Sequence, residues 1–248
     1  MAADQPSPWI LIRGLIRARY HWGDFPTRLQ QQLPASTPLL MPELAGNGER
    51  WREKTPFSIH AMMLDLRQQV KNQHHSDQPL TLVTISMGAM IGAEWARCFP
   101  DEVQALHMIN TSFSNLSTPW SRMRARAFFS LSATLLSGRD LEAAILRWTS
   151  SQPRNALAKE WKDYAQRHPL SLRNALAQLL AASRYHGPLS APVSNVHLYH
   201  SLGDQLVNPR CTARIAERWQ SPLSVHQRAG HDLPLDAPEW LINEILQA

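Results

Sequence analysis

Cysteine and long apolar segments are scarce in this chain, and each absence narrows what the protein can be. The 248 residues include two cysteines, Cys98 and Cys211, which do not form a metal-ligand spacing. A disulfide framework is therefore not expected, and the sequence predicts a protein of the reducing cytoplasm. No apolar run approaches the roughly 20 residues that cross a bilayer. The first residues lack the basic and apolar regions of a signal peptide. The sequence also contains no recognisable internal repeat or low-complexity segment.

The pattern that is present is an alternation of short apolar runs with helical periods. Apolar runs predict strands over 8–13, 38–41, 80–85 and 103–109, and helical spacing predicts helices over 23–33, 58–73 and 86–99. Strands and helices that alternate with short turns form a mostly parallel sheet with helices on both faces. The sequence therefore predicts an α/β fold.

The alternation stops near Pro119, and the pattern is helical from there to about Ser190. Strands return at 196–200 and near 223–227, and a last helix begins at Pro238. We therefore predict an α/β core made of residues 1–118 and 191–248. Residues 119–190 would form a helical cap inserted over one edge of the sheet.

The run Leu80–Ile85 is followed by a serine and then by a helix rich in small residues. A strand that turns sharply into a helix with serine at the corner is typical of the nucleophile elbow G-x-S-x-G. Here Thr84 stands where the first glycine is usual, and Ser86 and Gly88 match the rest. Such a turn projects the hydroxyl into a cleft, and the helix N-terminus favours an oxyanion. The alternative is a buried strand and an ordinary helix capped by Ser86.

A nucleophilic serine needs a base and an acid that orients the base. In hydrolases with this elbow, the acid and then the histidine follow the serine at the ends of later strands. Asp204 comes after the strand at 196–200, and His231 lies in a Gly-His turn before the last helix. This order predicts a triad of Ser86, Asp204 and His231. Alternatively, Asp204 is a plain turn carboxylate, His231 is one of 11 histidines without a special role, and Asp232 caps the last helix.

On these residues the chain resembles the α/β-hydrolase superfamily, of the esterase and lipase type with a helical cap. The matching segments are Arg13-Gly14-Leu15, residues 42–48, Ser86-Met87-Gly88, Gly203-Asp204 and Gly230-His231. In the superfamily the first segment is usually His-Gly, and the next backbone N–H forms half of the oxyanion hole. The resemblance implies that Leu15 and Met87 supply the two N–H groups. The first two antiparallel strands of that fold have no counterpart here.

The resemblance implies a serine esterase that needs no cofactor, metal or nucleotide. Ser86 would attack the carbonyl of a small-molecule acyl ester, His231 would take its proton, and Asp204 would orient the imidazole. An acyltransferase or thioesterase would use the same triad. A catalytically degenerate hydrolase fold that only binds a ligand is the alternative outside the enzymes. The net charge of +5 is not accompanied by a nucleic-acid-binding motif.

Basic residues concentrate in the predicted cap. Residues 119–190 hold eleven Lys or Arg and four acids, a balance of +7, whereas the whole chain carries +5. Arg122, Arg124 and Arg126 alternate with Met123 and Ala125. A solvated helix surface explains such charges. The other hypothesis is that the cap docks an acidic acyl carrier or the phosphates of coenzyme A, since arginine suits phosphate. In this respect the chain resembles carboxylesterases that act on pimeloyl-carrier-protein methyl esters.

Apolar residues of the cap have two possible roles. They either line an acyl pocket or pack the cap onto the core, and the sequence does not decide between these roles. The residues in question are Phe128, Phe129, Leu135, Leu136 and Trp148.

Overall fold

The computed structural model describes residues 6–74, 78–137 and 140–248. Within them a six-stranded sheet has the order β2-β1-β3-β4-β5-β6, and every neighbouring pair is parallel. The strands are β1 (Trp9–Ile12), β2 (Leu39–Leu40), β3 (Leu80–Ile85), β4 (Val103–Ile109), β5 (Val196–Ser201) and β6 (Leu223–His226). The predicted α/β class with a parallel sheet is confirmed.

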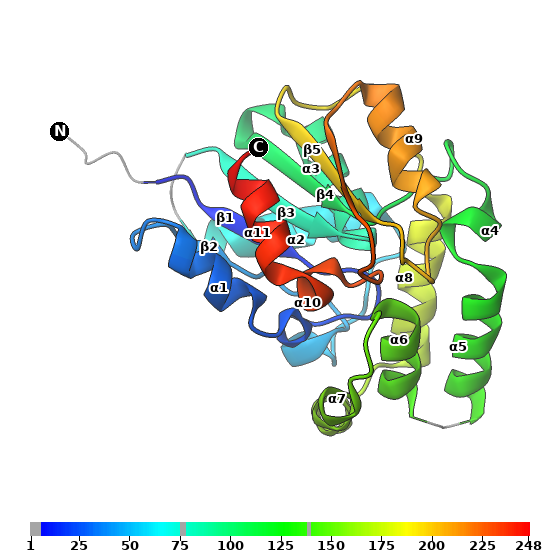
Figure 1. The fold of residues 1–248 in the computed structure, drawn as a ribbon. Helices are drawn as coiled ribbons and strands as arrows, with labels where there is room; N and C mark the ends of the chain where they lie inside the picture. The colour runs from blue at the N-terminus through cyan, green and yellow to red at the C-terminus, as the bar shows by residue number, and fades with distance from the viewer. Residues whose placement is uncertain (1–5, 75–77, 138–139) are drawn as a thin grey trace.

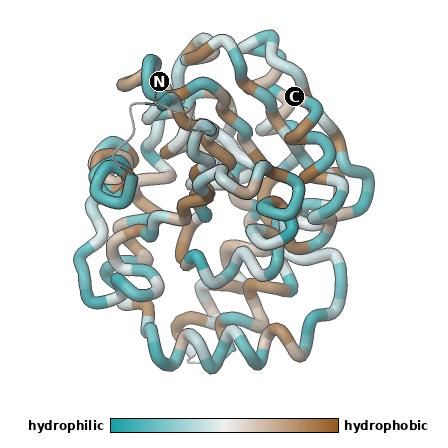
Figure 2. Tube along the Cα trace, turned by 90° about the vertical axis from the view of Figure 1, so that its left-hand side faces the viewer, coloured by the Kyte–Doolittle hydropathy of each residue, from teal (hydrophilic) through white to brown (hydrophobic). Residues whose placement is uncertain are grey.

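Helices cover both faces of this sheet, as Figure 1 shows. One face packs against α2 (Ile59–Gln73), α3 (Met87–Cys98) and α9 (Arg210–Trp219), and the other against α1 (Phe25–Gln32) and α11 (Pro238–Leu246). Alternate residues of each strand serve the two faces: Ile10 and Ile12 belong to the first cluster, and Leu11 belongs to the second. This alternation follows from the period of two in a strand and explains why the strands are apolar throughout. Figure 2 shows the hydrophobic segments gathered in the interior around the sheet.

The remaining helices between β4 and β5 fall within the range predicted for the cap. They are α4 (Pro119–Arg122), α5 (Ala125–Ser137), α6 (Leu141–Thr149), α7 (Asn155–Arg167) and α8 (Leu172–Arg184). Helix α5 packs against α6, and α6 packs against α7. In Figure 1 these helices lie beside the ends of the strands, where the chain leaves the sheet.

Two details differ from the predicted elements. Helix α1 begins at Phe25 rather than at Gly23, because Gly23 has a φ of 58° that a right-handed helix does not allow. A short helix, α10 (Leu233–Asp236), lies between His231 and the predicted last helix. Short 3-10 turns are η1 (Arg19–Trp22), η2 (Gly48–Arg50) and η3 (Pro100–Glu102).

Among the residues that the structure describes, none of the helices combines the length and the apolar character needed to cross a bilayer.

Candidate active site

Ser86 occupies the corner between β3 and α3 in a strained backbone conformation. Its φ is 58° and its ψ is −119°, a region that residues with a side chain rarely adopt. The end of β4 and the segment after it hold it there, because its N–H donates to the Ile109 carbonyl at 2.9 Å and its carbonyl accepts from Thr111 Oγ1 at 2.8 Å. The Ser86 side chain makes no capping hydrogen bond to α3. The hydroxyl of Ser86 is therefore not used to cap the helix.

Two glycines of α3 let the elbow form. A Cβ atom on Gly88 would lie 2.3 Å from the carbonyl oxygen of Ile12, so only glycine lets α3 start this close to β1. A Cβ on Gly92 would lie 2.9 Å from Cγ2 of Thr84. Thr84 is fully buried, and its hydroxyl donates to the His107 carbonyl at 2.8 Å. The bulk of Thr84 is thus accommodated by a glycine on the facing helix, two turns beyond the serine.

Asp204 and His231 lie together at the carboxyl ends of the last two strands. Asp204 Oδ2 and His231 Nδ1 are 2.7 Å apart, and both side chains are almost fully buried. The other carboxylate oxygen, Oδ1, accepts from the backbone N–H groups of Leu206 at 2.8 Å and Val207 at 2.9 Å. Because the carboxylate is held at both oxygens, it fixes the imidazole ring and leaves Nε2 free for other partners.

The side chain of Asn110 links the loop that carries His231 to strand β5, a role that the sequence did not reveal. Its side-chain amide donates to the His231 carbonyl at 2.8 Å, and its Oδ1 accepts from the Ser201 N–H at 3.0 Å. Asn110 has a φ of 45° directly after β4. Asparagine tolerates this conformation better than most residues, which explains why it ends the strand.

Arg13 and Asp232 form a second buried contact beside the histidine. Arg13 Nη1 and Nη2 donate to Asp232 Oδ1 and Oδ2 at 3.0 and 2.6 Å. The Arg13 guanidinium also lies 4.8 Å from the ring centre of Trp22. Asp232 therefore pairs with an arginine, and its side chain does not cap the last helix as the alternative interpretation proposed. This pair ties the segment after β1 to the segment that carries His231.

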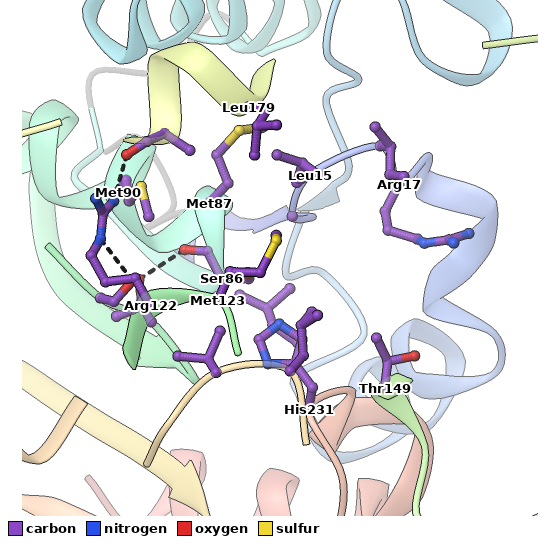
Figure 3. A pocket seen from close by; sticks show the side chains of 18 of the residues that line it. Leu15, Arg17, Ser86, Met87, Met90, Arg122, Met123, Thr149, Leu179 and His231 are labelled. Atoms are coloured by element: carbon purple, nitrogen blue, oxygen red, sulfur yellow. Dashed lines mark hydrogen bonds between the residues drawn. The ribbon is translucent and has the colours of Figure 1, made fainter. Parts of the chain in front are cut away.

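These segments surround one cavity of about 410 Å³. Ser86, His231, Leu15 and Met87 line it together, as Figure 3 shows. Met87 is the first residue of α3, so the helix does not use its backbone N–H. A Cβ on Gly14 would lie 3.0 Å from Ser86 Cβ, which places the loop before Leu15 against the serine. The structure thus brings the predicted Ser86, His231 and oxyanion residues to the same cavity, and Asp204 lies outside the lining and contacts His231.

The cap closes this cavity largely with apolar side chains. From the cap come Trp120, Met123, Phe128, Leu131, Ile145, Leu179 and Leu180. Of the five apolar cap residues singled out in the sequence, Phe128 alone lines the cavity; Phe129, Leu135 and Leu136 are exposed, and Trp148 is half-buried outside the lining. Of this set, only Phe128 is therefore placed to contact a molecule in the cavity.

The three alternating arginines do not form one basic surface. Arg122 turns inward and lines the cavity, and its guanidinium donates to the carbonyls of Ala182 and Ser183 at 2.5 and 2.8 Å. Burial lowers the pKa of Arg122 from its ordinary value. Arg124 is half-buried, and only Arg126 is exposed. The docking of an acidic acyl carrier on the cap stays a prediction.

Another cluster, away from the cavity, contains metal-ligating side chains. His60 Nδ1, Glu94 Oε1 and Cys98 Sγ lie within 4.8 Å of one another on α2 and α3. However, Arg97 donates to both oxygens of Glu94, at 2.9 and 2.7 Å. The carboxylate is already neutralised by an arginine, and we assign it an ion-pair role.

Comparisons with known proteins place the chain in a family. A family model described as the Alpha/beta hydrolase family matches residues 9–244. The chain belongs to this family. Hydrolases are therefore the class of enzyme to which the chain is related, and a comparison with curated proteins found no match.

Solved structures share the fold over almost the whole chain. A proposed lipase from Acinetobacter baumannii AYE has a TM-score of 0.78 at 17% identity, with 99% of this chain and 84% of that chain covered. A lipase-esterase related protein from Clostridium acetobutylicum ATCC 824 has a TM-score of 0.72 at 14% identity, with coverage of 98% and 95%. A thermophilic esterase from Thermogutta terrifontis has a TM-score of 0.72 at 18% identity, with coverage of 98% and 89%.

Proposed function

We propose that the protein is a serine hydrolase that cleaves a carboxylic ester through an acyl-enzyme. The observation that carries the proposal is the buried contact of 2.7 Å between Asp204 Oδ2 and His231 Nδ1, on the cavity that Ser86 lines. A carboxylate that holds one imidazole nitrogen leaves the other to act as a base toward a hydroxyl. The strained φ of Ser86 also supports the proposal, since such strain concentrates at nucleophile turns.

In this mechanism Ser86 Oγ attacks the acyl carbonyl while His231 Nε2 takes the hydroxyl proton. The resulting oxyanion is stabilised by the backbone N–H groups of Leu15 and Met87, and one such donor contributes about 3 kcal/mol. Collapse breaks the ester bond, and the alcohol leaves with the proton from His231. Water then attacks the acyl-enzyme, with His231 again as the base, and releases the acid and free Ser86. Asp204 stabilises the imidazolium at both steps.

The cavity favours a largely apolar acyl group. Its lining side chains are largely apolar, and the charges of Arg13 are matched by Asp232. Arg17, another arginine of the lining, pairs with Glu142 at 2.5 Å. Arg122, the third, donates to two backbone carbonyls of α8. The names of the similar structures, a lipase and esterases, agree with this substrate class. An acyltransferase or thioesterase would use the same groups, and no observation here favours either over an esterase.

Hydrolysis of 4-nitrophenyl butanoate tests the proposal. The wild type should release nitrophenol, and Ser86→Ala and His231→Ala should reduce the rate to background. Asp204→Asn should lower kcat by about 10⁴-fold, because the imidazole loses the carboxylate that sets its tautomer. Ser221→Ala is the matched control, since Ser221 is similarly half-buried but lies outside the cavity lining. Full activity in Ser86→Ala would refute the proposal.

A further inference from the structure

The turn that carries His231 packs against the end of α6, a helix of the cap. The Asp232 N–H donates to the carbonyl of Thr149, the last residue of α6, at 2.7 Å. A Cβ atom on Gly230 would lie 2.5 Å from the same carbonyl oxygen, so only glycine lets the turn come this close to the helix. Thr149 and His231 also line the cavity together, as Figure 3 shows. The two residues that flank His231 therefore both lie against the backbone of the cap.

Asp236, the last residue of α10, holds the same two segments together through its side chain. The side chain is fully buried, with an exposed fraction of 0%. Its Oδ2 atom accepts from the backbone N–H groups of Gly230 and Ser151, each at 2.7 Å. Its Oδ1 atom accepts from Ser150 Oγ at 2.6 Å and from Arg154 Nη2 at 3.2 Å. One carboxylate therefore connects the residue before the histidine to the segment that follows α6.

These contacts favour the ionised form of Asp236. Burial by itself raises the pKa of the carboxyl, but the hydrogen bonds from Ser150, Ser151 and Gly230 outweigh burial and hold the pKa below its ordinary value. Hydrogen bonds to an ionised acceptor are roughly twice as strong as those between neutral groups. Arg154 adds a further link, because its Nη2 also donates to the carbonyl that precedes Asp236, at 2.9 Å. The turn and the cap are thus held together by charge-assisted bonds.

The other end of α6 is held by a second ion pair. Arg17, in the segment after Leu15, pairs at 2.5 Å with Glu142 in the first turn of α6, and both residues are buried. The Arg17 guanidinium also lies 5.4 Å from the ring centre of Trp161 on α7. Helix α6 therefore connects the segment that carries the Leu15 N–H with the turn that carries His231. Since α6 is held at both ends, it offers the turn a fixed support.

The place of His231 decides whether it can act as the base. A base must lie within hydrogen-bond reach of the hydroxyl that it deprotonates, and a displacement of about 1 Å can reduce the rate about 10²-fold. We propose that Asp236 is a positioning residue that sets the place of His231 by holding Gly230 against the end of α6. This inference rests on the proposed ester hydrolysis, in which His231 is the base for Ser86. Asp236 itself lies outside the cavity lining and acts through the turn alone. The cap thereby supports the base as well as covering the cavity.

Asp236→Ala and Asp236→Asn test the inference with 4-nitrophenyl butanoate. In Asp236→Ala, kcat should fall by about 10²-fold, because the Gly230 N–H loses its partner and the turn is free to shift. KM should stay close to the wild-type value, because Asp236 does not line the cavity. Asp236→Asn keeps an oxygen that accepts from the same N–H, so its kcat should stay within about fivefold of the wild type. Asn110 attaches the turn to the sheet in every variant.

Glu102→Ala is the matched control. Glu102 also accepts from an arginine, Arg67, and from Trp95 Nε1 at 3.0 Å, but it lies just before β4, at the opposite end of the sheet from His231. This variant should lose stability and keep the wild-type kcat per active site. In all variants the active sites are counted by the end point of fluorophosphonate labelling, so that unfolded protein is excluded from the rates.

Gly230→Ala is a second variant, which decides the question if Asp236→Ala does not fold. It keeps the carboxylate of Asp236 but drives the turn away from the Thr149 carbonyl. Its kcat per active site should therefore fall by about 10²-fold with little change in KM.

The inference is overturned if Asp236→Ala or Gly230→Ala keeps the wild-type kcat per active site, or if KM rises while kcat stays constant. It is also overturned if Asp236→Asn loses as much activity as Asp236→Ala. If the wild type hydrolyses no ester and takes up no label, the proposed function fails, and crystal structures of the wild type and Asp236→Ala test the positioning by itself. A shift of the His231 turn by about 1 Å supports the inference, and an unmoved turn overturns it.

Discussion

The ion pair between Arg13 and Asp232 should be one of the most sensitive contacts of the fold. Its partners are 219 positions apart, and it joins the segment after β1 to the segment after His231. Their side chains are only 6% and 5% exposed. We predict that Arg13→Met or Asp232→Leu alone destabilises the protein by about 3–5 kcal/mol, because each leaves a buried charge without its partner. The double variant should be more stable than either single variant, since it buries no charge.

Thermal and denaturant unfolding measure this effect. In a chain of this size, 1 kcal/mol shifts Tm by about 2–4 °C, so each single variant should melt roughly 6–20 °C below the wild type. The reasoning would be refuted if the single variants lost less than about 1 kcal/mol, which is the value of an exposed pair. It would also be refuted if the double variant were as unstable as the sum of the two single changes, because the two charges would then not be coupled.

Two other predictions concern the core beneath the elbow. Gly92→Ala should lower the free energy of unfolding by about 1–3 kcal/mol, because its methyl group meets Thr84 Cγ2 and Leu106 Cδ1. Thr84→Ala in the same chain should restore part of this loss, and equal stability of the single and double variants would contradict this packing. Burial lowers the pKa of His107 to about 3, so the folded protein keeps this histidine neutral while the unfolded chain binds a proton below about pH 6.5. Stability should therefore rise with pH between about 3 and 6.5 and be complete above that window. His107→Gln should reduce this slope by up to about 1.4 kcal/mol per pH unit, as urea midpoints at pH 5, 6 and 7 would show; an unchanged slope would contradict it.

Local patterns were sufficient to predict the sheet. The bounds of β3 and β4 agree with the predicted strands at 80–85 and 103–109, because each is an apolar run between clear turn signals. Asp204 and His231 were predicted because the acid and then the histidine are expected at the ends of the strands that follow the serine. Parallel strands bring their carboxyl ends to one edge, so residues distant in sequence are expected at one site.

Pairings between distant side chains lay beyond these patterns. The contact of Arg13 with Asp232 has no local signature, and Asp232 was open to interpretation as a helix cap. The spacing of Arg122 suggested an exposed surface, but its side chain turns inward to the end of α8. Likewise, Thr84 departs from the elbow motif, and the compensation lies on the facing helix at Gly92. In each case the deciding neighbour is set by tertiary packing and not by the residue's own segment.

Covalent labelling with a fluorophosphonate, mapped by peptide mass spectrometry, tests the central claim most directly. The reagent should modify Ser86. Labelling should disappear in Ser86→Ala, which lacks the hydroxyl, and in His231→Ala, which lacks the base that activates it. Ser221→Ala should label as the wild type does. The absence of labelling in the folded protein with small reagents that pass the cap, or labelling of Ser86 that persists without His231, would contradict the assignment of these residues as nucleophile and base.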